Sequence, residues 1–542
     1  MTFDIEGYFP FEQIRSQQSR AIEFALDAFM NKGKRFVILE MGPGCGKSAT
    51  AVTIARYMQA HFELGQISLG GTYFLTTQKV LQKQYMRDFG APHGNMHTIK
   101  SASSITCQFH ENDMTGISCA EIRRLIGSKA QCKMVYKLCE DNCKYDAAKR
   151  RFFDAPEGIT NYAFFLALSA YTYDMQRRGL LVLDEAHNVA DLVGNFVTIG
   201  FSNLFYKDVL GVKPPNVNAG QERIYRWLMH TVRPALQRII KKEANNLNKG
   251  LDENAAIKAV KHLERLKHSF QKIEQFVDVY DPTTWVLDSS KTDRRGERVY
   301  QFKPTDVGRY CENILYAQAD KVLLMSATIL NKNLFCESLG IRPSEAEFLR
   351  IPSPFDVVKR PIHYMPVGSM SRAKINDTLP SMIQAIKVIM DEHPTEKGII
   401  HCVNFHIADE IVKTLGGKRL LAHTSDDREE IIKFHITSKQ PTVLVSPSMT
   451  EGVDLVDDLS RFQIVCKVPY PYLGDASVRR KMKRNSRWYA YQTVKTVIQG
   501  LGRSIRNDND HAISYILDSD WGQFFVQNSD MFPDEFTQSL QY

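Results

Sequence analysis

Long apolar runs are missing from this sequence of 542 residues. No stretch reaches the roughly 18 consecutive apolar residues of a membrane-spanning helix. Residues 1–18 show neither the basic segment nor the apolar segment of a secretory signal. Internal repeats and low-complexity segments are also absent, which argues against a repeat array or a disordered chain. We therefore expect a cytoplasmic or nucleoid-associated globular protein that is neither secreted nor embedded in a membrane.

A strong charge of one sign is missing as well. The 69 Lys and Arg residues exceed the 61 Asp and Glu residues by only +8, a mild excess that suits a polyanionic partner without requiring one. With 43% hydrophobic residues, the chain can bury several cores. Its length favours roughly three or four domains over a single one.

Short apolar stretches rich in β-branched residues indicate buried strands of parallel sheets. Long helical segments fill the region from about residue 190 to 310, and strands return after about residue 352. We therefore predict an α/β protein with two parallel-sheet domains, of which the first carries a helical insertion. The expected strands lie at residues 35–40, 71–77, 179–187, 321–328, 397–405, 441–448, 461–469 and 511–518.

The first strand is followed at once by a glycine-rich segment, MGPGCGKS. Glycines let backbone N–H groups approach phosphate oxygens, and the helix expected to begin near Lys47 offers its positive dipole end. We expect Lys47 to reach the β- and γ-phosphates of a nucleotide and Ser48 to bind Mg²⁺. The strict pattern has glycine where Met41 stands, so the segment matches a looser form of the loop. The predicted nucleotide contacts are Gly42, Gly44, Cys45, Gly46, Lys47, Ser48 and Ala49.

Asp184 and Glu185 lie near the end of the strand expected at residues 179–187. Phosphoryl transfer needs a second acidic element that holds Mg²⁺ and orients water. We predict that the Asp184 carboxylate holds Mg²⁺ and that Glu185 is the general base for the attacking water. An acidic pair at a strand end is often only a helix cap, but the preceding glycine loop favours the catalytic interpretation.

Gln499, Arg503 and Arg506 belong to the segment QGLGRSIR in the second predicted domain. The two arginines are spaced i, i+3 and would share one helical face. Arginine at such a place can stabilise charge on a γ-phosphate, so we predict catalytic roles for all three residues. The nucleotide would then bind between two sheets, at an interface that opens and closes with hydrolysis.

Half of the ten cysteines fall in one short region. Because thiols stay reduced in the cytosol, this concentration indicates a metal site rather than disulfides. Four thiolates could hold zinc or an iron–sulfur cluster, and the spacing does not separate the two. The candidate ligands are Cys107, Cys119, Cys132, Cys139 and Cys143, of which four are needed.

In this order the motifs resemble those of the XPD/DinG family of superfamily 2 helicases, over essentially the whole chain. Residues 8–18 are similar to the family's adenine-recognition segment. Residues 184–187 (DEAH) resemble its acidic box, residues 326–328 (SAT) its coupling motif, and residues 451–454 (EGVD) its motif V. The resemblance adds Gln18, Gly452 and Asp454 to the expected nucleotide contacts.

The resemblance also implies two RecA-like motor domains, an inserted [4Fe–4S] domain and a helical arch. Cys107 and Cys143 are then the firmest ligands, and two of Cys119, Cys132 and Cys139, preferred in that order, complete the set. The expected segments are residues 1–100, 158–191 and 319–352 for the first motor domain, 101–157 for the cluster domain, 192–318 for the arch and 353–542 for the second motor domain.

The activity that the resemblance implies is ATP- and Mg²⁺-dependent unwinding of DNA duplexes or R-loops, with 5′-to-3′ movement on a single strand. Expected partners are single-stranded and forked DNA, with RNA in hybrids left open, and the chain is expected to be a monomer. The alternatives are a translocase without productive unwinding and a nucleotide-switched scaffold in a repair or replication assembly. Since the first motif begins within ten residues of the start, no N-terminal nuclease extension is expected.

A segment near residue 475 interleaves basic and aromatic side chains, a mixture on which single strands stack and pair. A solvated basic helix explains the same pattern equally well. The residues concerned are Tyr470, Tyr472, Arg479, Arg480 and Lys481.

Overall fold

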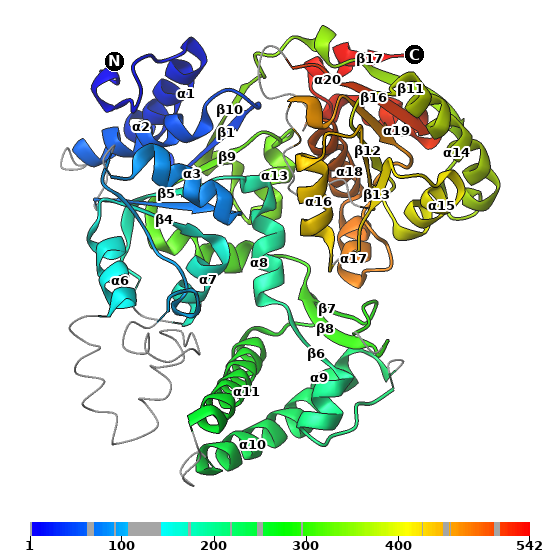
Figure 1. Ribbon diagram of the computed structural model, residues 1–542. Helices are drawn as coiled ribbons and strands as arrows, with labels where there is room; N and C mark the ends of the chain where they lie inside the picture. The colour runs from blue at the N-terminus through cyan, green and yellow to red at the C-terminus, as the bar shows by residue number, and fades with distance from the viewer. Residues whose placement is uncertain are drawn as a thin grey trace.

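The computed structural model describes residues 3–61, 70–91, 94–106, 143–171, 175–216, 219–246, 253–293, 296–424, 426–447, 455, 457–502 and 510–542. In this part of the chain, two seven-stranded parallel sheets form two domains that lie side by side, with a smaller body below them (Figure 1). The predicted α/β architecture with two parallel sheets is confirmed. None of the helices described here is long and apolar enough to cross a membrane.

The first sheet has the strand order β10-β1-β9-β5-β2-β4-β3, so segments far apart in the chain pair within it. Its central strands are buried on both faces, as their apolar sequences require. The strands are β1 (Phe36–Met41), β2 (Thr72–Thr76), β3 (Met96–Thr98), β4 (Glu157–Asn161), β5 (Arg178–Leu183), β9 (Ala319–Ser326) and β10 (Ala346–Ile351). The accompanying helices are α1 (Ser16–Leu26), α2 (Lys47–Ala60), α3 (Lys79–Phe89), α6 (Lys144–Asp154), α7 (Tyr162–Tyr171), α8 (Val189–Val197), α12 (Gly308–Ile314) and α13 (Lys332–Leu339).

The second sheet has the order β13-β14-β12-β15-β16-β11-β17. Its strands are β11 (Ile362–Gly368), β12 (Gly398–His401), β13 (Leu420–Ala422), β14 (Val443–Ser446), β15 (Phe462–Val465), β16 (Ile513–Asp518) and β17 (Leu540–Gln541). Its helices are α14 (Ile375–Glu392), α15 (Phe405–Leu415), α16 (Arg428–Thr437), α17 (Ala476–Arg484), α18 (Ser486–Leu501), α19 (Asp520–Gln527) and α20 (Asp534–Ser539).

The body below the two sheets, residues 199–304, is called the insertion here (Figure 1). Its helices were expected from the sequence, but it also contains a three-stranded antiparallel sheet of order β6-β8-β7. Together they enclose a core that includes Trp285 and Phe276. The elements are β6 (Ile199–Ser202), α9 (Gln221–Trp227), α10 (Arg233–Asn246), α11 (Glu253–Val279), β7 (Trp285–Asp288) and β8 (Val299–Pro304).

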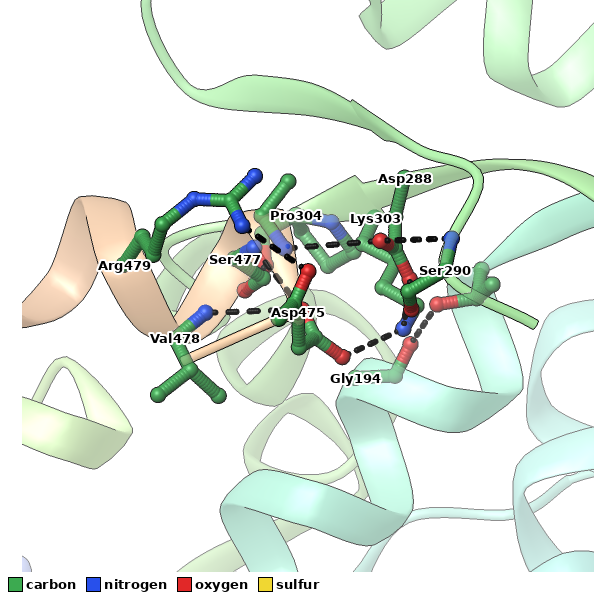
Figure 2. A network of polar contacts seen from close by, with 12 residues as sticks. Gly194, Asp288, Ser290, Lys303, Pro304, Asp475, Ser477, Val478 and Arg479 are labelled. Carbon is green, nitrogen blue, oxygen red and sulfur yellow. Dashed lines mark hydrogen bonds and ion pairs between the residues drawn. The ribbon is translucent and has the colours of Figure 1, made fainter. Parts of the chain in front are cut away.

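A buried ion-pair network joins the insertion to the second domain (Figure 2). Lys303 Nζ of β8 lies 2.7 Å from Asp288 Oδ2 and 2.5 Å from Asp475 Oδ2. Asp475 is also the N-cap of α17, since its Oδ1 accepts a hydrogen bond from Ser477 N at 2.8 Å. Burial disfavours the Asp288 carboxylate, but Lys303 and hydrogen bonds from Ser290 together hold the Asp288 pKa below its ordinary value. We call this set of contacts the insertion junction.

Candidate nucleotide site

The glycine loop connects β1 to α2, and α2 begins at Lys47 as expected. Gly44 and Gly46 have φ angles of 78° and 75°, in the left-handed region that favours glycine. A Cβ atom on Gly46 would also collide with the side chain of Gln18. The loop therefore depends on glycine at these two positions, and it leads directly into the first turn of α2, because Gly46 is the N-cap residue.

The N-terminal segment packs directly on this loop. Gln18 is 5% exposed, and its Oε1 accepts a hydrogen bond from Arg15 N at 3.0 Å. Arg15 Nη1 in turn donates to the carbonyl of Gly44 at 2.8 Å. The segment expected to recognise adenine thus contacts the loop expected to hold phosphate.

Asp184 lies at the carboxyl end of β5 and is 5% exposed. Its Oδ1 accepts from Glu185 N at 2.9 Å, and its Oδ2 accepts from Tyr85 Oη at 3.2 Å. Burial, reinforced by Glu185, raises the pKa of Asp184 above its ordinary value, and the cation of Lys47 opposes the rise. A cation placed beside Asp184 would stabilise its charged form and lower the pKa again, as expected for a carboxylate that holds Mg²⁺.

Glu185 adopts a positive φ of 52°, in the left-handed region of backbone conformation. Its Oε2 lies 3.3 Å from His187 Nδ1, and the same ring nitrogen is 2.7 Å from Ser326 Oγ. A glutamate in the left-handed backbone region is uncommon and costs conformational energy. Such a conformation persists where the surrounding structure holds the residue in place. The acidic box and the SAT segment are therefore connected through His187.

Contacts with the second domain begin at the SAT segment. Thr328 N donates to Ser326 Oγ at 3.1 Å, and Gln499 Nε2 of α18 donates to Thr328 Oγ1 at 2.8 Å. Lys495 Nζ, one turn earlier on α18, donates to the carbonyl of His187 at 3.3 Å. One helix of the second domain thus contacts both polar segments of the first.

Most of the predicted nucleotide-site residues that the structure describes line one cleft of about 540 Å³ between the two domains. The first domain contributes the glycine loop and the acidic box, and the second contributes the C-terminal end of α18. The candidates lining the cleft are Gly42, Gly44, Gly46, Lys47, Ser48, Asp184, Glu185 and Gln499. Cys45, Ala49 and Gln18 are buried and are not among the residues that line the cleft.

Glu40 was not anticipated from the sequence, although a carboxylate inside the otherwise apolar β1 is itself an unusual signal. It is 3% exposed and lines the cleft. Its Oε2 accepts a hydrogen bond from Leu330 N at 2.7 Å, and its Oε1 lies 3.6 Å from Arg350 Nε. Leu330 has a φ of 63°, so Glu40 holds the strained turn that follows the SAT segment.

Glu40→Gln should remove a pH dependence of stability. Burial raises the Glu40 pKa from 4.5 to about 7, against the opposing charge of Arg350. Between these two values the folded protein retains a proton that the unfolded chain has lost, so the free energy of unfolding falls as pH rises, by roughly 3 kcal/mol. Denaturant titrations at pH 5 and 8 should show this decline in the wild type and a flatter profile in Glu40→Gln. An equal decline in both proteins would contradict this assignment.

Several predicted site residues lie outside the described residues. They are Cys107, Cys119, Cys132, Cys139, Gly452, Asp454, Arg503 and Arg506. Cys143 is described: it is buried, 6% exposed, and precedes α6 as its N-cap residue. Within the described residues, no group of three or more His, Cys, Asp or Glu side chains is arranged to hold a metal ion.

The basic and aromatic segment near residue 475 is engaged within the protein. Arg480 Nη1 donates to the carbonyls of Pro282 and Trp285 in the insertion, at 3.2 and 3.3 Å. Arg479 Nη1 donates to the carbonyl of Leu473 at 2.8 Å. Arg480 therefore also joins α17 to the insertion and is not part of a fully solvated helical face.

Two parallel-sheet domains that share a glycine-loop cleft define the two-domain RecA-like ATPase fold. A family model described as "Helicase C-terminal domain" matches residues 389–538, and one described as "Type III restriction enzyme, res subunit" matches residues 12–210. These matches, with the relatives and solved structures that follow, confirm the resemblance of the motifs to the XPD/DinG family of superfamily 2 helicases.

Individual relatives agree with this assignment. The "ATP-dependent DNA helicase DinG" of Photobacterium profundum is 25% identical over 310 residues, which cover 51% of this chain and 43% of that protein. The "ATP-dependent DNA helicase CHL1" of Candida albicans is 33% identical over 103 residues, covering 16% of this chain and 12% of that protein. The matches thus span less than half of these relatives.

Solved structures show the same fold along nearly the whole chain. A structure titled "XPD_Helicase" has a TM-score of 0.64 at 14% identity and covers 96% of this chain and 98% of that one. Another structure, titled "XPD_APO", has a TM-score of 0.59 at 13% identity and covers 95% of this chain and 98% of that one.

Proposed function

We propose that this protein is an ATP-dependent DNA helicase that moves along a single strand. The observation that carries the proposal is the cleft in which the glycine loop and acidic box face α18 of the second domain. A nucleotide bound there would contact both domains, so its hydrolysis would change how they close on each other. That cycle of closure is what a motor needs in order to step along a polymer.

In this proposal the described residues divide the chemistry among them. Lys47 would bind the β- and γ-phosphates, and Ser48 and Asp184 would hold Mg²⁺, which supplies positive charge beside the phosphates. Glu185 accepts the proton of the attacking water, a role that suits a carboxylate that lines the cleft next to the carboxylate of Asp184. Gln18 contributes to recognition of adenine from its place against Gly46.

Coupling to movement follows the hydrogen bonds from Glu185 through His187 and Ser326 to Thr328 and Gln499. A change at Glu185 during hydrolysis would be passed to α18 through side chains that already contact one another. The sequence motifs add four nucleotide contacts to this proposal. They are Gly452, Asp454, Arg503 and Arg506.

The resemblance to this family is the basis for the proposed polarity and substrate. The protein would move 5′-to-3′ on single-stranded DNA and unwind forks or R-loops. Strand displacement on forked duplexes with only a 5′ or only a 3′ single-stranded arm tests this directly. We expect ATP-dependent displacement with the 5′ arm and little with the 3′ arm. ATP-dependent movement without displacement on forked and R-loop substrates would instead support a translocase.

We further propose that four of the five clustered cysteines hold a [4Fe–4S] cluster. Cys143 suits this role because it is buried at the N-terminus of α6, where the helix dipole favours a thiolate. The cluster would supply a compact cross-link among distant cysteines.

Iron analysis tests the proposed cluster. Protein purified without oxygen should be brown and contain about four irons per chain. Cys143→Ser should lower the iron content, whereas Cys311→Ser, which replaces a buried cysteine of the first-domain core, should not. A colourless protein containing zinc would contradict the cluster.

A further inference from the structure

Arg360 lies where the chain enters the second domain, two residues before β11. It lines the same cleft as the glycine loop. Its guanidinium atoms Nε and Nη2 are buried, and neither has a hydrogen-bond partner within the part of the chain that is described. Arginine stays charged in proteins, so these two nitrogens place positive charge in the cleft without a described acceptor.

The nearest acidic groups already have partners. Glu535 Oε1 pairs with Arg350 Nη2 at 2.9 Å, and Asp356 Oδ1 accepts a hydrogen bond from Val358 N at 3.0 Å. Both carboxylates act on Arg360 through their charge, while burial lowers the Arg360 pKa. A further anion that enters the cleft would therefore find donors ready to bind it.

The chain leading to Arg360 packs on the glycine loop. Ser353 Oγ donates to the carbonyl of Pro43 at 3.4 Å, and the Phe355 ring covers Gly44 so closely that no Cβ would fit there. Arg360 thus follows, within a few residues, side chains that contact the loop expected to hold phosphate. Guanidinium groups bind phosphate oxygens in a bidentate manner, which matches two adjacent unpaired nitrogens.

We propose that Arg360 binds a phosphate group of the nucleotide from the second domain, in addition to Arg503 and Arg506. The inference rests on the proposed function, because it requires a nucleotide on the glycine loop. It adds a contact that belongs to neither the glycine loop nor the QGLGRSIR segment. Through it, the segment that joins the two domains would respond to whether phosphate is present.

Arg360→Gln and Arg360→Lys test the proposal in the full-length protein. Affinities for fluorescent ADP and for a fluorescent non-hydrolysable ATP analogue are measured by titration, and thermal unfolding is followed with and without nucleotide. For Arg360→Gln we expect about tenfold to hundredfold weaker binding of at least one nucleotide. Arg360→Lys should lie between the glutamine variant and the wild type, because it keeps the charge but loses the bidentate geometry.

Unfolding without nucleotide separates this role from a structural one. Because Arg360→Gln removes an unpaired buried charge, its Tm without nucleotide should equal or exceed that of the wild type. The increase in Tm caused by nucleotide should be smaller in the variant than in the wild type. The matched control is Arg419→Gln, because the Arg419 guanidinium donates to carbonyls that include those of Pro441 and Met390, at 2.7 and 2.8 Å. This control should lower the Tm and leave nucleotide affinity unchanged.

An Arg360→Gln protein with a lowered Tm and wild-type affinity for both nucleotides would make Arg360 a structural residue and overturn the inference alone. A wild-type protein that binds neither nucleotide would overturn the proposed function, and the inference with it.

Discussion

Glu185→Gln should lower the rate of ATP hydrolysis by roughly 10²–10⁴-fold, because the amide cannot accept the proton of the attacking water. Glutamine keeps the size of the side chain, and Lys47 and the glycine loop remain intact. Nucleotide affinity should therefore stay within a fewfold of the wild type. Steady-state hydrolysis and nucleotide titration on the same preparation measure the two quantities.

A matched control for this variant is Glu312→Gln. Glu312 pairs with Arg35 at the surface, 2.7 Å away, and does not line the cleft. Its replacement should leave hydrolysis unchanged. Hydrolysis by Glu185→Gln at the wild-type rate would remove Glu185 as the general base and leave His187 or another cleft residue to be tested.

Lys303→Met should destabilise the insertion and its contact with the second domain by roughly 3–5 kcal/mol, because it leaves the buried carboxylate of Asp288 without its cation. Asp288 is 2% exposed, so water replaces little of the lost interaction. Asp475 loses the same cation but retains its hydrogen bonds to the N-terminus of α17. Denaturant unfolding and limited proteolysis of the insertion measure the effect.

Lys207→Met is the corresponding control. Lys207 also belongs to the insertion and pairs with Glu297 at 3.2 Å, but both side chains are more than 40% exposed. Replacing an exposed pair should cost less than about 1 kcal/mol. Equal losses of stability in the two variants would show that burial of the insertion junction contributes nothing.

Local patterns predicted much of the fold. The apolar stretch before the glycine loop forms β1, and each of the eight strands expected from such stretches is found in one of the two sheets. These predictions succeed because a parallel strand buried on both faces must be apolar along its length. The start of α2 at Lys47 could likewise be predicted from the glycine loop.

The antiparallel sheet of the insertion could not be predicted as readily. Strand β7 has four residues and β8 has six, and both lie beside long helical segments that dominate the pattern. The alternating burial along β8 is visible in VYQFKP only once the strand is known. Short strands of this kind depend on tertiary pairing more than on their own sequence.

The other features that could not be predicted are contacts between residues that are far apart in the sequence. Glu40 binds the backbone of Leu330, and Lys303 pairs with Asp475 from another domain. Arg480 stood out as a candidate for contact with nucleic acid, yet it donates to carbonyls of the insertion. The partners of these residues follow from which surfaces meet, and no local pattern of the sequence predicts them.

The central claim is that hydrolysis in the interdomain cleft drives movement on single-stranded DNA. The most direct test measures the rate of ATP hydrolysis by the wild-type protein with and without single-stranded DNA, beside Glu185→Gln as the background. The account predicts a manyfold increase with single-stranded DNA that is absent from the variant. A wild-type rate unaffected by single-stranded DNA would contradict the motor and favour a nucleotide-switched scaffold.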